Sequence, residues 1–148
     1  MNTHPYLRAY LAGVFVPTLV LPLVLTVFIV ARIVLRVPVP IEQAMIFPMA
    51  IVPSLFGLWN MLWVATHART NLPIGVQGAL LPFLMVPTGA VTAGCFGILQ
   101  LGASGLTWFH ACYVPYAFIA VGFLCGVAIY YLVWKYIVGF LNRILGIA

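Results

Sequence analysis

Acidic residues are almost missing from this chain, because Glu42 is the only one among 148 residues. Charged residues make up 5% of the chain and hydrophobic residues 66%, whereas a water-soluble surface needs about a quarter of its residues charged. The composition therefore predicts a protein whose solvent is lipid. Most hydrolytic, metal-dependent and proton-relay chemistry uses more than one carboxylate, so the same shortage argues against these activities.

Other kinds of chemistry also lack the residues that they need. The only lysine, Lys135, stands at the end of the last long apolar run, which argues against a retinal protein. The three cysteines form no CxxC pair and no metal-binding spacing (Cys95, Cys112 and Cys125). His67 and His110 are expected at opposite boundaries of a membrane core about 30 Å thick, too far apart to share one haem or metal. No particular cofactor is indicated.

Long apolar runs fill most of the chain. A membrane-crossing helix takes about 20 apolar residues, and four such helices are predicted, at about 11–31, 44–66, 77–101 and 113–134. The runs are continuous, whereas the strands of a membrane barrel alternate between apolar and polar residues. The expected fold is an all-α integral membrane protein, a single domain over 1–148 that forms a bundle of four transmembrane helices.

Positive charge predicts the orientation of this bundle. Four basic residues fall on one side of a four-crossing path and two on the other (Arg8, Arg69, Lys135 and Arg143 against Arg32 and Arg36). Cytoplasmic segments carry an excess of such residues, so both termini are predicted to be cytoplasmic. The net charge of +5 is spread over both faces, which favours anionic lipid headgroups as neighbours and not nucleic acid.

The charged residues near 32–42 have two interpretations each. Arg32 and Arg36 are spaced for one helical face, where they are candidates for contact with a lipid headgroup; anchoring at the membrane surface is the favoured alternative. Glu42 follows Pro40 at a predicted helix start. There Glu42 can stabilise the helix through its dipole or form an ion pair with a nearby arginine. Both of these roles are favoured over that of a carboxylate whose protonation is coupled to transport.

Proline pairs recur in three of the four predicted helices. The members of each pair are five residues apart (Pro17 and Pro22, Pro48 and Pro53, Pro82 and Pro87). A proline inside a helix removes a hydrogen bond and crowds the preceding turn, so these three helices are expected to be proline-kinked. Thr18, Ser54 and Thr88 each follow one proline, and their hydroxyls can bond to carbonyls in the preceding turn. The bends could serve as hinges, although static packing is favoured.

Small residues recur at four-residue spacing in the last two predicted helices. They are Gly89, Ala93 and Gly97 in the third helix and Gly122 and Gly126 in the fourth. Small residues at this spacing let helix backbones approach closely in lipid. The pattern predicts that these helices pack against each other or against copies in an oligomer.

Few polar residues lie within the predicted helices. Asn60 is the main candidate, because an amide in hydrocarbon must find partners inside the bundle. It is predicted to tie helices together, with Thr92 and Gln100 as candidate partners. The alternative is that Asn60, Thr88, Thr92 and Gln100 form the polar lining of a solute path.

Two functions from different classes fit these features. The favoured prediction is a non-catalytic integral membrane module, an accessory subunit or lipid-associated scaffold whose partners are membrane lipids and other transmembrane helices. The alternative is a small oligomeric transporter or channel for an apolar or weakly polar solute. A transporter needs a connected cavity that polar side chains face, whereas an accessory subunit needs a packed interior and an apolar face for a partner.

Overall fold

The computed structural model describes residues 4–37, 40–109 and 112–147 of the chain. These residues are mostly helical, as predicted. The helices are α1 (Pro5–Ile33), α2 (Ile41–Thr70), α3 (Ile74–Cys95) and α4 (Tyr116–Leu132), and α4 continues through a π-helical segment η1 (Val133–Val138) into α5 (Gly139–Ile144). Within the described residues, four helices are long and apolar enough to cross a membrane, the fourth running from Tyr116 to Ile144.

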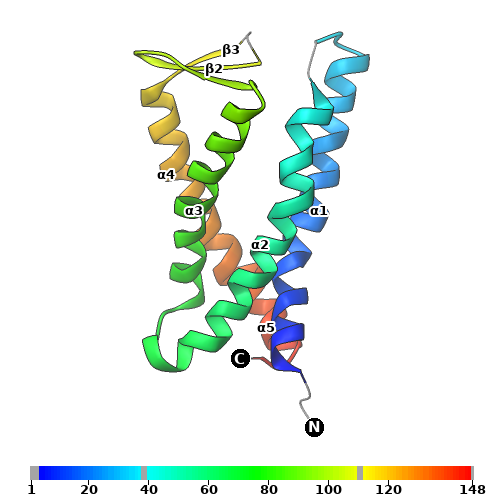
Figure 1. The fold of residues 1–148 in the computed structure, drawn as a ribbon. Coiled ribbons are helices and arrows are strands. Elements are labelled where there is room, and N and C mark those ends of the chain that lie inside the picture. The colour runs from blue at the N-terminus through cyan, green and yellow to red at the C-terminus, as the bar shows by residue number, and fades with distance from the viewer. Residues whose placement is uncertain (1–3, 38–39, 110–111, 148) are drawn as a thin grey trace.

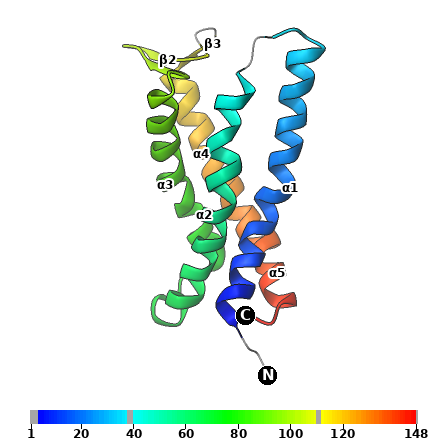
Figure 2. The ribbon, with the colours of Figure 1, turned by 45° about the vertical axis from the view of Figure 1, so that its right-hand side comes forward.

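The helices form two pairs that meet at one end of the molecule. α1 lies beside α2, and α3 lies beside α4 (Figures 1 and 2). Both termini and the turn between α2 and α3 lie at the end where the pairs meet, which we call the terminal end. The pairs diverge toward the opposite end, which we call the sheet end because a small β-sheet covers α3 and α4 there (Figure 1).

The small sheet corrects the all-α prediction. Its strands β1 (Leu99–Leu101), β2 (Gly105–Trp108) and β3 (Cys112–Pro115) are antiparallel in the order β1-β2-β3. Leu99 pairs with Trp108, and Leu106 pairs with Val114. The helix predicted over 77–101 therefore ends at Cys95, and the one predicted over 113–134 begins only at Tyr116 and continues beyond Trp134.

Gly97 ends α3 through backbone geometry. Its φ of 69° lies in the left-handed region that glycine adopts without strain. The Gly97 N–H donates to the Gly94 carbonyl over 3.0 Å, and the Ile98 N–H donates to the Ala93 carbonyl over 2.9 Å. This pair of hydrogen bonds is the Schellman motif that closes many helices. Gly97 is thus a helix terminator, and its predicted place in a packing stripe of the third helix is wrong.

The most tightly packed region lies where the two helix pairs meet. Phe56, Leu81, Trp134 and Val138 form a buried cluster contributed by α2, α3 and η1. A methyl group added at Gly78 of α3 would collide with the Trp134 side chain, so only glycine allows this approach. At the α1–α2 contact, a methyl group at Gly13 would collide with the Phe56 carbonyl and lie 2.9 Å from the Gly57 Cα.

The π-helical segment aligns three buried side chains of the last helix. Trp134, Val138 and Asn142 are each 0% exposed and follow one another at four-residue steps. An α-helix has about 3.6 residues per turn, so such a stripe drifts around its surface. The wider turn of a π-helix opposes this drift. It therefore helps to keep all three side chains on the face that packs inside the bundle.

Candidate functional site: an apolar cleft between the helix pairs

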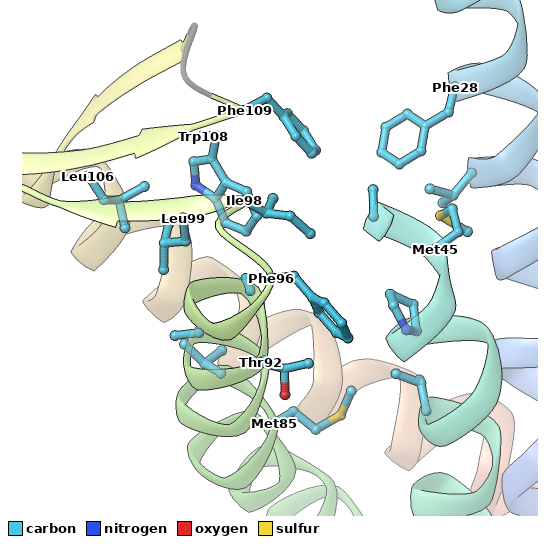
Figure 3. A pocket seen from close by; sticks show the side chains of 18 of the residues that line it. Phe28, Met45, Met85, Thr92, Phe96, Ile98, Leu99, Leu106, Trp108 and Phe109 are labelled. Carbon is cyan, nitrogen blue, oxygen red and sulfur yellow. The ribbon is translucent and has the colours of Figure 1, made fainter. Parts of the chain in front are cut away.

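A cleft of about 630 Å³ separates the two helix pairs in the half of the molecule nearer the sheet. Figure 3 shows Phe28 of α1 and Met45 of α2 on one wall, facing Phe96 and Phe109 across the space. The cleft forms because the pairs are joined at the terminal end and diverge from it (Figures 1 and 2). Its volume lies in the usual range of small-molecule sites, about 300–1,000 Å³.

The cleft reaches about half-way along the helices. Along α3 and its C-cap residue, the lining runs from Met85 to Phe96, which is about 16 Å at the rise of an α-helix. Leu21 of α1 and Val52 of α2 line it at a similar depth, and each stands near the middle of its helix. A membrane hydrocarbon core is about 30 Å thick. The depth of the cleft therefore corresponds to about one leaflet of a membrane.

The lining of the cleft is almost entirely apolar. Aliphatic and aromatic side chains dominate it, and α2 adds Pro48. Thr92 contributes a hydroxyl, but its Oγ1 already donates to the Thr88 carbonyl over 2.8 Å. Trp108 contributes an indole at the end near the sheet (Figure 3). Such a lining suits a hydrocarbon or another apolar group and offers little to a polar solute.

Two buried asparagines join helices on the side of the cleft nearer the terminal end. Asn60 of α2 and Asn142 of α5 are both 0% exposed, and their amides bond reciprocally over 2.8 and 3.1 Å. The Asn60 amide also donates to the Ala9 carbonyl of α1 over 2.8 Å. Three helices are thereby joined by polar contacts in an otherwise apolar region. The two amides satisfy each other, as buried polar groups must.

The rim of the cleft carries an ion pair. Arg32 Nη1 lies 2.8 Å from Glu42 Oε1, and both side chains are exposed. Arg32 stands one helical turn beyond Phe28, and Glu42 stands one turn before Met45, so the pair lies just above the two residues that begin the cleft wall. The hydrogen bond from Arg32 lowers the pKa of Glu42. The pair therefore persists at neutral pH and is lost as the pH falls through that lowered pKa.

The structure does not bring the predicted polar residues together. Thr92 lines the cleft, but Asn60 lies in the closed region and bonds to Asn142 and Ala9 instead of Thr92 or Gln100. The exposed Thr88 donates to the Leu84 carbonyl over 2.7 Å. The exposed Gln100 pairs with Thr107 in the sheet. These residues do not form a continuous polar lining.

The predicted small residues are also divided between different surroundings. Gly89 and Ala93 line the cleft between the helix pairs. Gly122 and Gly126 line a second, smaller cavity of about 360 Å³ between α3 and α4. A methyl group added at either glycine would meet nothing within 4 Å. Within one chain, Gly122 and Gly126 therefore leave space and do not bring the two helix backbones into contact.

The sequence did not indicate Asn142 or the part of the cleft wall at the sheet end. Asn142 fell outside the predicted fourth helix, because that prediction stopped at Trp134. Gly102 and Gly105 fall in the predicted connection between the third and fourth helices, although glycines flanking Ala103 and Ser104 are typical of a hairpin turn. That turn was the available signal for the wall formed by Trp108 and Phe109. The prediction about His110 lies outside the described residues.

Neither a metal-binding group among the described residues nor similarity to a known protein indicates a function for the cleft. Among the described residues, no group of three or more His, Cys, Asp or Glu side chains could hold a metal ion. Comparison of the chain with protein-family models, curated proteins and solved structures gave no match. The function must therefore be inferred from the geometry and chemistry of the cleft.

Proposed function

We propose that this protein is a non-catalytic multi-pass membrane module that holds an apolar molecule in the cleft between its helix pairs, as a lipid-associated scaffold. The observation that carries this proposal is an apolar cleft of about 630 Å³ that reaches to mid-helix depth. Inside a membrane, such a space is open to acyl chains and to other apolar molecules dissolved in the lipid.

The proposal places the four long helices across the membrane with both termini in the cytoplasm. Arg8 and Arg143 lie in the helices of the terminal end, whereas Arg32 lies at the sheet end of α1. This distribution supports a cytoplasmic terminal end. The proline pairs lie inside α1, α2 and α3, and the hydroxyl of Thr18 donates to the Val14 carbonyl over 3.0 Å. We propose that proline-dependent bends in these helices help to separate the two pairs.

Cysteine labelling tests this placement in the membrane. Cys112 lies exposed in β3 at the sheet end, and Cys125 lies exposed within α4. In variants that keep a single cysteine, a membrane-impermeant maleimide is expected to label Cys112 in intact cells. Cys125 is expected to react only after detergent dissolves the membrane. Labelling of Cys112 only after permeabilisation would reverse the orientation, and labelling of Cys125 in intact membranes would contradict the membrane crossing.

Filling the cleft tests the binding of an apolar molecule. The probe is palmitic acid that carries a photoactivatable diazirine, cross-linked to the protein in membranes and mapped by peptide mass spectrometry. Thr92→Phe places a ring in the cleft and is expected to reduce cross-links at residues such as Met45 and Met85 by about ten-fold, because the ring takes the space of the chain. The measured quantity is the cross-link yield at these residues.

Val91 provides the matched control for this substitution. It precedes Thr92 on α3, but its side chain is 68% exposed on another face of the helix. Val91→Phe is expected to leave the cross-links in the cleft unchanged. Equal yields in both variants and in the original protein would mean that the probe does not occupy the cleft, and the proposed function would then fail.

One observation favours a small transporter or channel as the second candidate. The cleft lies in the half of the molecule nearer the sheet, whereas the half nearer the terminal end is packed by the Asn60–Asn142 contact and by Trp134. A closed half next to an open half is what an alternating-access protein presents in one of its states. Loss of solute flux in Asn60→Ala, with fold and assembly retained, would favour this candidate over the scaffold.

A further inference from the structure

The rim of the cleft combines an apolar slot with positive charge. Arg32 lies in the last turn of α1 at the sheet end. Arg36 follows the end of the helix with its backbone in the left-handed region at φ 55°, so the two arginines do not share the helical face that their spacing predicted. Both side chains are exposed. Glu42 is the only acidic residue of the chain and neutralises one of these arginines through its ion pair with Arg32. The segment from Arg32 to Glu42 therefore keeps a net positive charge at the sheet end of α1, beyond Phe28 of the apolar wall.

The depth of the cleft selects the kind of apolar group. About 16 Å of lining along α3 corresponds to one leaflet of a core about 30 Å thick. Trp108 lines the cleft at the end near the sheet, and tryptophan is enriched at the level of lipid headgroups. A molecule that fits would have its apolar part between the helix pairs and its polar part near Arg32 and Arg36. A bilayer phospholipid of the leaflet at the sheet end has this form.

We propose that the ligand of the cleft is an anionic phospholipid, with one acyl chain between the helix pairs and its headgroup phosphate at Arg32 and Arg36. This inference rests on the proposed function, because it identifies the molecule that the cleft would hold. Charge complementarity favours an anionic over a zwitterionic headgroup, since the rim has two arginines and one carboxylate. Each basic residue near a membrane surface contributes to binding of anionic lipid.

The experiment compares two phospholipid probes with the same diazirine-bearing acyl chain. Phosphatidylglycerol and phosphatidylcholine are each incorporated into vesicles with the full-length protein, cross-linked, and mapped onto the chain. We expect phosphatidylglycerol to label the cleft about five-fold more than phosphatidylcholine. In a chain carrying both Arg32→Gln and Arg36→Gln, this preference should be lost while some labelling of the cleft remains.

Two further variants separate a headgroup contact from a general effect of charge. Glu42→Gln removes the partner of Arg32 and is expected to increase the preference for phosphatidylglycerol, because that arginine becomes available to phosphate. Arg69→Gln removes an exposed positive charge from the C-terminal turn of α2, at the terminal end. It is the matched control and is expected to leave the preference unchanged. A decrease in Glu42→Gln, or an equal loss in Arg69→Gln, would overturn the inference.

The possible results distinguish this inference from the proposed function. Equal labelling of the cleft by both phospholipids would overturn the anionic headgroup but would keep an apolar ligand in the cleft. Labelling by palmitic acid alone would overturn the phospholipid and keep the proposed function. Absence of cleft labelling by all three probes, in protein that remains folded and membrane-inserted, would overturn both.

Discussion

Trp134→Ala is expected to lower the free energy of unfolding by about 3–5 kcal/mol, the usual cost of truncating a large buried aromatic side chain. Trp134 is 0% exposed and packs against Phe56 with ring centroids 6.0 Å apart. In lipid, helix association depends chiefly on such van der Waals packing, so the cavity would weaken the junction of the helix pairs. The measurement is reversible unfolding of the detergent-solubilised protein by titration with SDS.

The neighbouring Gly78 provides a second arm of this test. Gly78→Ala alone is expected to cost about 1–3 kcal/mol, because the added methyl group collides with the Trp134 ring. In the Trp134→Ala background the same methyl group would fall into the cavity and cost far less. The two substitutions should therefore be strongly non-additive. Additive costs would contradict the close contact between Gly78 and Trp134.

Two control substitutions separate packing from other effects. Gly122→Ala adds a methyl group that meets nothing within 4 Å, so it is expected to be neutral or slightly stabilising through better helix propensity. Trp134→Phe keeps most of the aromatic volume and removes an indole N–H that has no hydrogen-bond partner among the described residues. It should cost clearly less than Trp134→Ala. A similar loss in both Trp134 variants would point away from packing.

Asn60→Ala and Asn142→Ala are each expected to cost about 1–3 kcal/mol, because either change leaves the other buried amide without its partner. The double variant should cost less than the sum of the single variants, with a coupling energy of about 0.5–3 kcal/mol. SDS-induced unfolding of the four members of the cycle measures this coupling. The coupling energy should fall toward the lower part of this range, since amides in membranes also find partners in the unfolded state.

Thr88→Ala is the matched control for the asparagine cycle. Thr88 is exposed, and its hydroxyl bonds to the Leu84 carbonyl of its own helix. Its removal is expected to change the free energy of unfolding by less than about 0.5 kcal/mol. A coupling near zero between Asn60 and Asn142, or a Thr88→Ala effect as large as theirs, would contradict the assigned role of the asparagine pair.

The predictions for Trp134 and for the asparagine pair concern the half of the molecule nearer the terminal end, whereas the cleft lies in the half nearer the sheet. Trp134 and the asparagine pair join the helix pairs at the terminal end, so the pairs can diverge toward the sheet without coming apart. Weakening the junction should therefore reduce stability more than it changes the chemistry of the cleft wall. Substitutions at Thr92 and Arg32 act on the wall and the rim, and should affect ligand binding more than stability.

The sequence by itself determined the helical class and the number of long apolar helices. For Glu42 it favoured a role on the helix dipole or in a pair with a nearby arginine, and the structure identifies Arg32 as that partner. Each of these depends on local information. A run of about 20 apolar residues specifies a helix without reference to neighbours, and the lone acidic residue stands close along the chain to two arginines. The hydroxyl groups that follow Pro17 and Pro87 also bond within their own helices, as their spacing predicted.

Only the tertiary structure decided the cleft and the asparagine pair. Asn60 and Asn142 are 82 positions apart, and their contact depends on how α2 and α5 are oriented. The sequence offers Thr92 and Gln100 as candidate partners of Asn60, but α3 ends at Cys95 and Gln100 lies in the sheet. The cleft exists because contacts such as Phe56–Trp134 and Asn60–Asn142 join the two helix pairs in one half of the molecule while the pairs diverge in the other. A linear pattern records which residues are apolar, whereas the space between them depends on helix angles set by distant contacts.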